Sequence, residues 1–188
     1  ILGGDRMALR AVTRIDDDVD TLHCHIVTYL GRISQKALTE EQTRELVHLM
    51  DAANNLENIG DIVETDLAYL GNQRIEQGVS ISVATQAVLK KLHNVVMATV
   101  SLAIDAVAEN DPHAAQEIIA MKTDIARLTD SAAMHETRRL VAEEPNRLAA
   151  YTVEMDVIEK LKRIYYHAKR MAKDVTPDEE TETEERVA

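Results

Sequence analysis

The stretch Leu56-Glu57-Asn58-Ile59-Gly60-Asp61 decides the fold of this chain. Its apolar positions share one face of a helix, and the two carboxylates lie one turn apart beside them. Further along the chain the same frame reads Leu161-Lys162-Arg163-Ile164-Tyr165-Tyr166, in which the apolar spacing is kept and the acids are gone. The sequence therefore predicts two related helical units, of which only the first is equipped to hold a cation.

The composition favours a few long helices with an aliphatic core. The chain has 188 residues, of which 45% are hydrophobic, and it contains no Trp or Phe, six Gly and three Pro. So few turn-forming residues leave little room for many short strands. The net charge of −12 argues against a basic surface for nucleic acid or an anionic membrane. The chain starts without Met at Ile1, which we interpret as a sign that it was excised from a longer polypeptide.

The apolar periodicity predicts five helices. They run from about Asp5 to Ser34, from the capping box at Thr39 to a stop at Gly71 and Asn72, from Ser80 to Glu109, from Asp111-Pro112 through His135, and from Pro145 or Asn146 to Pro177. Five long helices joined by short loops must run up and down, so the predicted fold class is all-α, with helical bundles.

An internal repeat divides the chain into two bundles. The positions Val12, Ile15, Val19, Leu22 and Ile26 match Ile118, Met121, Ile125, Leu128 and Ala132 at constant spacing. We expect residues 1–75 to form a first bundle with two helices, residues 76–176 a second bundle with three, and residues 177–188 an acidic disordered tail. If the repeat unit is three helices, the first bundle lacks its first helix. Its docking groove should then be open and could pair two copies of the chain as a homodimer.

Two rows of acidic side chains follow the apolar faces of the first two helices. Asp16 and Asp20 lie one turn apart on the first helix, as Glu57 and Asp61 do on the second. Carboxylates at this spacing suit iron, zinc or manganese, so these four residues are the predicted metal ligands, with His23 and Glu64 as further candidates. The corresponding repeat positions hold none of these acids: they are Lys122, Ala126, Lys162, Tyr166 and Lys169. The alternative is that the acids form ordinary solvated faces, which would cost little free energy.

No motif predicts catalysis. Cys24 is the single cysteine, and no base or oxyanion site is evident near it. Glu45-Leu46-Val47-His48 resembles the Glu-x-x-His of carboxylate-bridged metal proteins, but no second pair follows. We therefore interpret His48 as a surface residue, and His135, which falls on an apolar face, as an interior one.

With Asp16-x-x-x-Asp20 and Leu56-Glu57-Asn58-Ile59-Gly60-Asp61 together, the chain resembles the PhoU family from about Arg6 to Val175. The resemblance implies tandem three-helix bundles whose acidic pairs bind metal clusters. Asn58 replaces the Arg that is usual in the motif, and the second motif has lost its acids, so a second metal site is not expected.

The degenerate second bundle and the start at Ile1 look most like the PhoU-like C-terminal domain of bacterial sodium/phosphate cotransporters. That resemblance implies a non-catalytic regulatory domain at the cytoplasmic face of the inner membrane, with the membrane-spanning part of the same polypeptide as its partner. The alternatives are a stand-alone PhoU-type phosphate-signalling regulator and a carboxylate-bridged metalloprotein.

Overall fold

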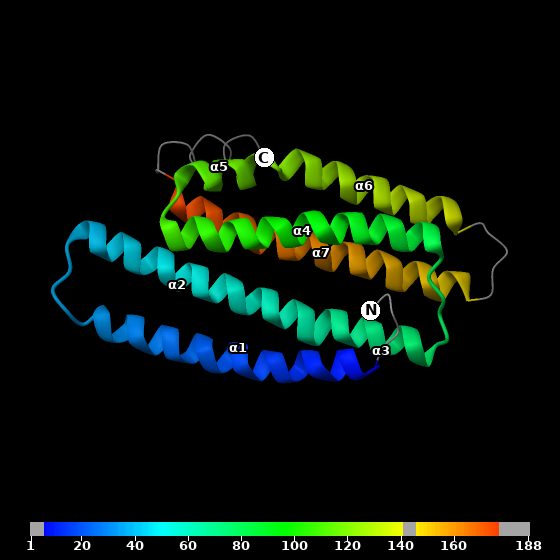
Figure 1. Cartoon of the computed structure of the whole chain (residues 1–188), viewed down its shortest axis with the longest axis horizontal. Helices are drawn as coiled ribbons and strands as arrows, with labels where there is room; N and C mark the ends of the chain where they lie inside the picture. Colours follow the sequence, from blue (N-terminus) through cyan, green and yellow to red (C-terminus); the bar gives the residue numbers. More distant parts are fainter. Residues whose placement is uncertain (1–5, 141–145, 177–188) are drawn as a thin grey trace.

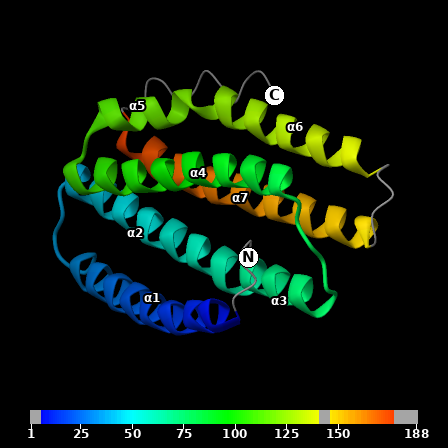
Figure 2. The same cartoon turned by 45° about the vertical axis from the view of Figure 1, so that its right-hand side comes forward.

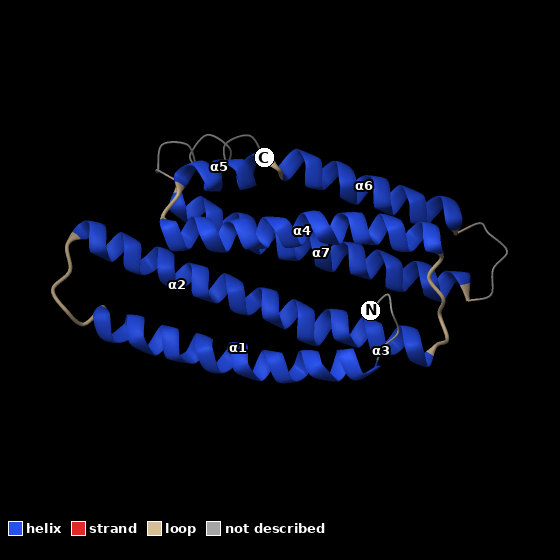
Figure 3. Cartoon of the chain, viewed as in Figure 1, coloured by secondary structure: helices blue, strands red, loops and turns tan. Residues whose placement is uncertain are grey.

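The computed structural model describes residues 6–140 and 146–176, and within these ranges every regular element is a helix. The all-α prediction is confirmed (Figure 3). The helices are α1 (Arg6–Ile33), α2 (Glu40–Asp61), η1 (Ile62–Leu67), α3 (Ala68–Glu76), α4 (Val83–Glu109), α5 (Pro112–Ala120), α6 (Lys122–Arg139) and α7 (Arg147–Val175). The predicted tail, residues 177–188, lies outside the described residues, as does Pro145.

The helices form a layered array of long, roughly aligned segments with α1 at one edge and α5–α6 at the other (Figure 1). Helix α7 is the hub, because it packs against α2, α4, α5 and α6. Among the described elements, helix α1 packs mainly against α2, η1 and α3, so its described partners lie on one side (Figure 2). We call α1 to α3 the first bundle and α4 to α7 the second bundle.

Several predicted helix ends are confirmed by their caps. Thr39 and Gln42 form the reciprocal capping box at the start of α2, with Gln42 N–H donating to Thr39 Oγ1 at 3.2 Å. Asp111 Oδ1 accepts from the amides of His113 and Ala114, with Pro112 in the first turn of α5. These local signals hold because they satisfy the unpaired amides of a helix start.

The predicted stop at Gly71 is wrong. Gly71 is buried inside α3, where a small residue allows close packing, and the helical path continues to Glu76. The chain turns at Gly78, whose φ of +62° suits glycine, and Val79 N–H donates to the carbonyl of Arg74 at 3.0 Å. The path also widens into the π-helix η1 directly after Asp61, which the period of the sequence does not reveal.

The fourth predicted helix is interrupted at Met121, which separates α5 from α6. On the outer face of α1 two of the predicted apolar repeat positions, Ile15 and Leu22, are exposed instead. The core lies mainly between α4, α5, α6 and α7, with Leu89, Leu92, Ile118, Ile125 and Ile158 among its fully buried side chains. Helix α4 is long and apolar enough to cross a membrane by length and composition alone. About a third of that apolar window, 33%, is buried in the structure.

Candidate functional site

The acidic site lies where α1 meets α2 and η1. Asp16 is half-buried on α1, and burial is the largest of the causes that raise the pKa of its carboxyl. The negative charges of Asp20, Glu64 and Asp61 raise it further. The structure therefore brings Asp16, Asp20, Asp61 and Glu64 together, and we call these four residues the acidic cluster.

Gly60 allows the two helices to approach at this point. A Cβ atom on residue 60 would lie 3.2 Å from Asp16 Oδ1 and 3.4 Å from Val19 Cγ1. A larger residue at position 60 would therefore push Asp16 away from Asp61. The glycine in the motif thus leaves room for the Asp16 carboxylate at the α1–α2 contact, and its counterpart in the second bundle is Tyr165.

Two polar contacts brace the acidic cluster, and the sequence did not reveal either. Thr13 Oγ1 donates to Glu64 Oε1 at 3.1 Å across the helix pair, and Thr65 Oγ1 donates to Glu64 Oε2 at 2.9 Å. Glu64 lies in η1, so the widened turn sets where its carboxylate meets α1. The sequence did offer one indication of the first contact, because Thr13 lies about one helical turn before Asp16.

The remaining predicted ligands lie less centrally. Glu57 is half-buried one turn before Asp61, and no described interaction joins it to the acidic cluster. The ring of His23 is hydrogen-bonded through Nε2 to Asn54 Oδ1 at 3.0 Å, so it is tied to α2. In the described ranges no three His, Cys, Asp or Glu side chains surround a common point suited to a metal. To bind an ion, carboxylates of the acidic cluster would have to change rotamer. Their oxygen atoms and uncompensated negative charge nevertheless suit a cation.

The sequence predicted a surface position for His48 and an interior position for His135, and the structure agrees with the second prediction better than with the first. His48 is not a simple surface residue: it is half-buried and lines a polar cavity of about 460 Å³ with Glu45, Asp174 and Thr176. Burial and the nearby charge of Asp51 raise the pKa of Asp174, while His48 lowers it. His135 is half-buried with its Nε2 3.4 Å from Thr85 Oγ1, as expected for an interior histidine. Cys24 is exposed and free.

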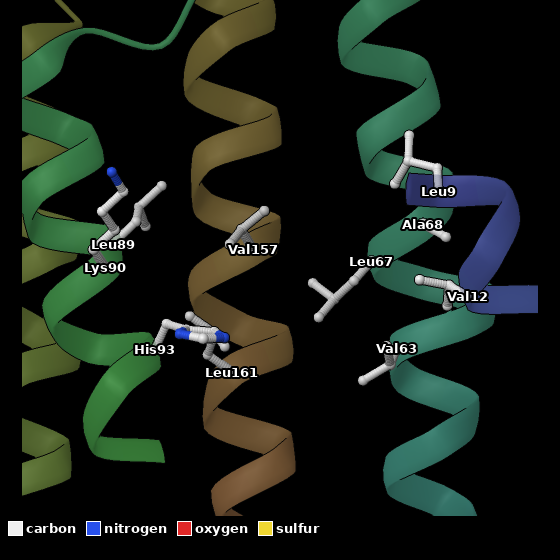
Figure 4. A pocket seen from close by; sticks show the side chains of 10 residues that line it. All are labelled: Leu9, Val12, Val63, Leu67, Ala68, Leu89, Lys90, His93, Val157 and Leu161. Carbon is white, nitrogen blue, oxygen red and sulfur yellow. The ribbon is translucent and has the colours of Figure 1, made fainter. Parts of the chain in front are cut away.

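An apolar pocket of about 410 Å³ lies between the two bundles (Figure 4). Side chains of α1, η1 and α3 face those of α4 and α7 across it. The lining residues are Leu9, Val12, Val63, Leu67, Ala68, Leu89, Lys90, His93, Val157 and Leu161. Val12 of this lining corresponds in the repeat to Ile118, which is fully buried within the second bundle.

Comparisons with known proteins agree with this geometry. The PhoU domain family matches residues 1–65 and 89–175. The crystal structure of PhoU from Pseudomonas aeruginosa superposes with a TM-score of 0.83 over 93% of this chain and 82% of that one, at 22% identity. YjbB of Escherichia coli K12, which is named for inorganic phosphate export, is 22% identical over 118 residues. YjbB of Salmonella typhimurium is 23% identical over the same length.

These alignments cover 63% of this chain and 22% of each YjbB protein, so the chain corresponds to a small part of those relatives. The family match, in contrast, covers most of the chain and both helical repeats. This chain therefore belongs to the PhoU domain family.

Proposed function

We propose that this chain is the regulatory domain of a sodium-dependent phosphate transporter, held at the cytoplasmic face of a bacterial inner membrane. It would have no catalytic activity of its own and would be joined to the membrane-spanning part of the same polypeptide. The observation that carries the proposal is that the domain matches only 22% of the length of its YjbB relatives. Those relatives are named for inorganic phosphate export. Most of such a polypeptide would then lie outside the domain.

The open outer face of α1 supports attachment to a further helix. Ile15 is 62% exposed and Leu22 is 59% exposed. In the second bundle, α4 packs against α5 and α6, where Ile118 and Ile125 are buried. We infer that a helix preceding Arg6 in the longer polypeptide covers this face, as α4 covers α5 and α6 in the second bundle.

The test uses the longer polypeptide in lipid vesicles, with phosphate flux as the measured quantity. Deleting the domain should change the flux at a given phosphate concentration, and Leu22→Asp should reproduce part of that change by preventing helix docking. The matched control is Leu148→Asp, because Leu148 is 70% exposed on α7 of the second bundle. Unchanged flux after deletion would contradict the transporter proposal. A dimeric isolated chain that becomes monomeric on Leu22→Asp would instead indicate that a second copy covers the face.

The acidic cluster supports a metal-binding role in the same domain. We propose that Asp16, Asp20, Glu57 and Asp61 bind iron, zinc or manganese, with His23 and Glu64 as further candidate ligands. The supporting observation is that partial burial and four neighbouring carboxylates raise the pKa of Asp16, so its ionised form lacks a compensating charge.

Elemental analysis of protein purified without chelator tests the metal proposal. The native chain should carry metal at a fixed ratio, and Asp16→Asn/Asp61→Asn should lose it. Asp124→Asn/Asp130→Asn, two exposed acids of α6, is the matched control and should keep it. Equal and substoichiometric metal in all three proteins would rule out the site.

A stand-alone PhoU-type phosphate regulator is the second candidate. The fold match to PhoU of Pseudomonas aeruginosa, which spans most of both chains, favours it. In that case the domain would act through a separate transporter or sensor protein. Two results together would favour this second candidate. The domain would pull down a membrane protein encoded by another gene, and deleting the domain from the longer polypeptide would leave the phosphate flux unchanged.

A further inference from the structure

A buried ionic cluster joins α6 to α7 in the second bundle, away from the acidic cluster. Glu136 and Glu154 are 0% exposed and Arg147 is 6% exposed. Arg147 Nη1 donates to Glu154 Oε2 at 2.8 Å, and its Nη2 donates to Glu136 Oε2 at 3.1 Å. Arg147 Nε also donates to the carbonyl of Arg139 at 3.1 Å, which fixes the last turn of α6. We call these three side chains the buried trio.

The charges of the buried trio do not balance if both carboxyl groups are ionised. One guanidinium would face two carboxylates, and the Oε1 atom of each glutamate is buried without a hydrogen-bond partner among the described atoms. An uncompensated buried charge and two unsatisfied oxygens are costly. One proton removes the problem, because a neutral carboxyl group gains an O–H donor that the other carboxylate can accept.

Among the described residues, Arg147 is the arginine that pairs with both glutamates, and the other groups near the buried trio are uncharged, histidine or bonded elsewhere. From α4, Thr85 Oγ1 lies 3.4 Å from Glu136 Oε2, and Thr85 is uncharged. From α6, His135 Nε2 lies 3.9 Å from Glu136 Oε1, and Arg139 donates to Thr85 Oγ1 at 2.9 Å and to the hydroxyl of Ser82. From α3, which also packs on α7, Arg74 and Glu76 are the charged side chains of the last turn.

We propose that Glu136 and Glu154 share one proton, and that release of this proton loosens the end of the second bundle where α6 meets α7. The domain would thus respond to proton concentration at a point separate from its metal and docking surfaces. This inference goes beyond the proposed transporter function and does not depend on it.

The electrostatics of Glu154 support this assignment. The pKa of Glu154 is raised from 4.5 to about 7, with burial as the largest cause. The neighbouring carboxyl group of Glu136 also raises it, and Arg147 opposes the rise. Because the folded-state pKa lies above the usual value, the folded protein binds the proton more tightly than the unfolded chain. The resulting stabilisation is fully present below 4.5 and is lost as the pH rises through about 7.

Carbon-13 NMR of the glutamate side-chain carboxyl groups tests the shared proton directly. In the native chain, one carboxyl resonance should titrate near neutral pH, at a higher pH than the resonances of the exposed glutamates. The Glu154→Gln substitution should remove that resonance. The thermal midpoint of the native chain should fall by about 3 °C or more between about pH 5 and about pH 8, and that of Glu154→Gln should fall less.

Glu159→Gln is the matched control, because Glu159 is an exposed glutamate on the same helix. It should keep the native pH dependence of the thermal midpoint. Two results would each overturn the proposal: all glutamate carboxyls of the native chain titrating below about pH 5.5, or parallel pH profiles for Glu154→Gln and Glu159→Gln. If Glu154→Gln does not fold, Glu136→Gln replaces it in the thermal experiment, and the native-chain titration remains decisive.

Discussion

The two bundles share one apolar frame and place their carboxylates in opposite environments. In the first bundle, Asp16 and Asp61 lie at the rim of a helix pair whose outer face is open. In the second bundle that face is covered by α4, and the carboxylates of Glu136 and Glu154 lie inside the core around Arg147. The apolar frame thus specifies the fold, while charged groups beside it are free to diverge.

The location of the carboxylates decides which role each bundle can have. Rim carboxylates keep access to solvent and can exchange a cation, whereas core carboxylates can exchange little more than a proton. The first bundle is therefore suited to ligand binding and docking. The second is suited to holding the core together, with one titratable connection.

The largest expected difference between the bundles comes from removing the central cation of the buried trio. Arg147→Met would leave two buried carboxyl groups without their guanidinium, so the free energy of unfolding should fall by about 3–5 kcal/mol. Chemical denaturation followed by circular dichroism measures this. Arg127→Met, at an exposed arginine paired with Asp124, should change it by less than about 1 kcal/mol.

Neutralising both acids should rescue the Arg147→Met protein. In Glu136→Gln/Glu154→Gln/Arg147→Met no buried charge remains, so part of the lost stability should return. If Arg147→Met and Arg127→Met cost the same, the buried trio does not stabilise the second bundle.

Identical substitutions at matched positions compare the open and covered faces. Leu128 is half-buried in the second bundle, and Leu22 is its exposed counterpart in the first. Leu128→Ala should lower the free energy of unfolding by about 2 kcal/mol, and Leu22→Ala by less than about 0.5 kcal/mol.

Repeating the leucine pair in the longer polypeptide sharpens the comparison. If a preceding helix covers the first bundle, Leu22→Ala should there become nearly as costly as Leu128→Ala. Equal and small effects of Leu22→Ala in both proteins would mean that the outer face of α1 stays open.

Local sequence signals predicted the helix starts, because a capping side chain and the amides it satisfies are close in sequence. Thr39 with Gln42 and Asp111 with Pro112 are such signals. The π-turn after Asp61 was not predictable, because the apolar spacing of the sequence continues through residues 62–67 and gives no sign that the backbone hydrogen bonds widen there. Gly71 was misinterpreted because burial, which the sequence does not show, decides whether a glycine ends a helix or packs inside one.

The candidate site was only partly predictable for a related reason. Helical spacing places Asp16 beside Asp20, but which residues of the second helix meet them depends on the rotation of that helix. Around Asp16 the structure places Asp61 and Glu64. The buried trio was not predicted, because its residues come from two helices whose contact the sequence does not show. One indication was present: Glu154 lies one turn before the apolar Ile158 on the same face of α7.

A smaller effect is expected from filling the close contact between α1 and α2. Gly60→Ala gains helix propensity of up to about 1 kcal/mol, but its Cβ would press on Asp16 Oδ1 at 3.2 Å. Because that oxygen ends a rotatable side chain, we expect a net gain of about 0.5 kcal/mol in metal-free protein. Metal content should fall, since Asp16 is displaced.

Gly31→Ala is the matched control for this glycine. A Cβ atom at position 31 has no neighbour within 4 Å, so the substitution should leave metal content unchanged. Loss of metal in both variants would mean that helix packing in general, and not the position of Asp16, controls binding.

The smallest expected effect concerns the charge of Asp16 itself. Because burial and neighbouring acids raise the pKa of Asp16 above 3.8, ionised Asp16 is a net cost to the folded state once the pH exceeds that raised pKa. Asp16→Asn should therefore stabilise the metal-free protein at neutral pH by a few tenths of a kcal/mol, discounted for solvent exposure, and have no effect in strong acid. Denaturation at both pH values checks this, and added Mn²⁺ should reverse the order by stabilising only the native chain. If Mn²⁺ stabilises both proteins equally, Asp16 is an ordinary rim carboxylate, and the first bundle differs from the second only in its open face.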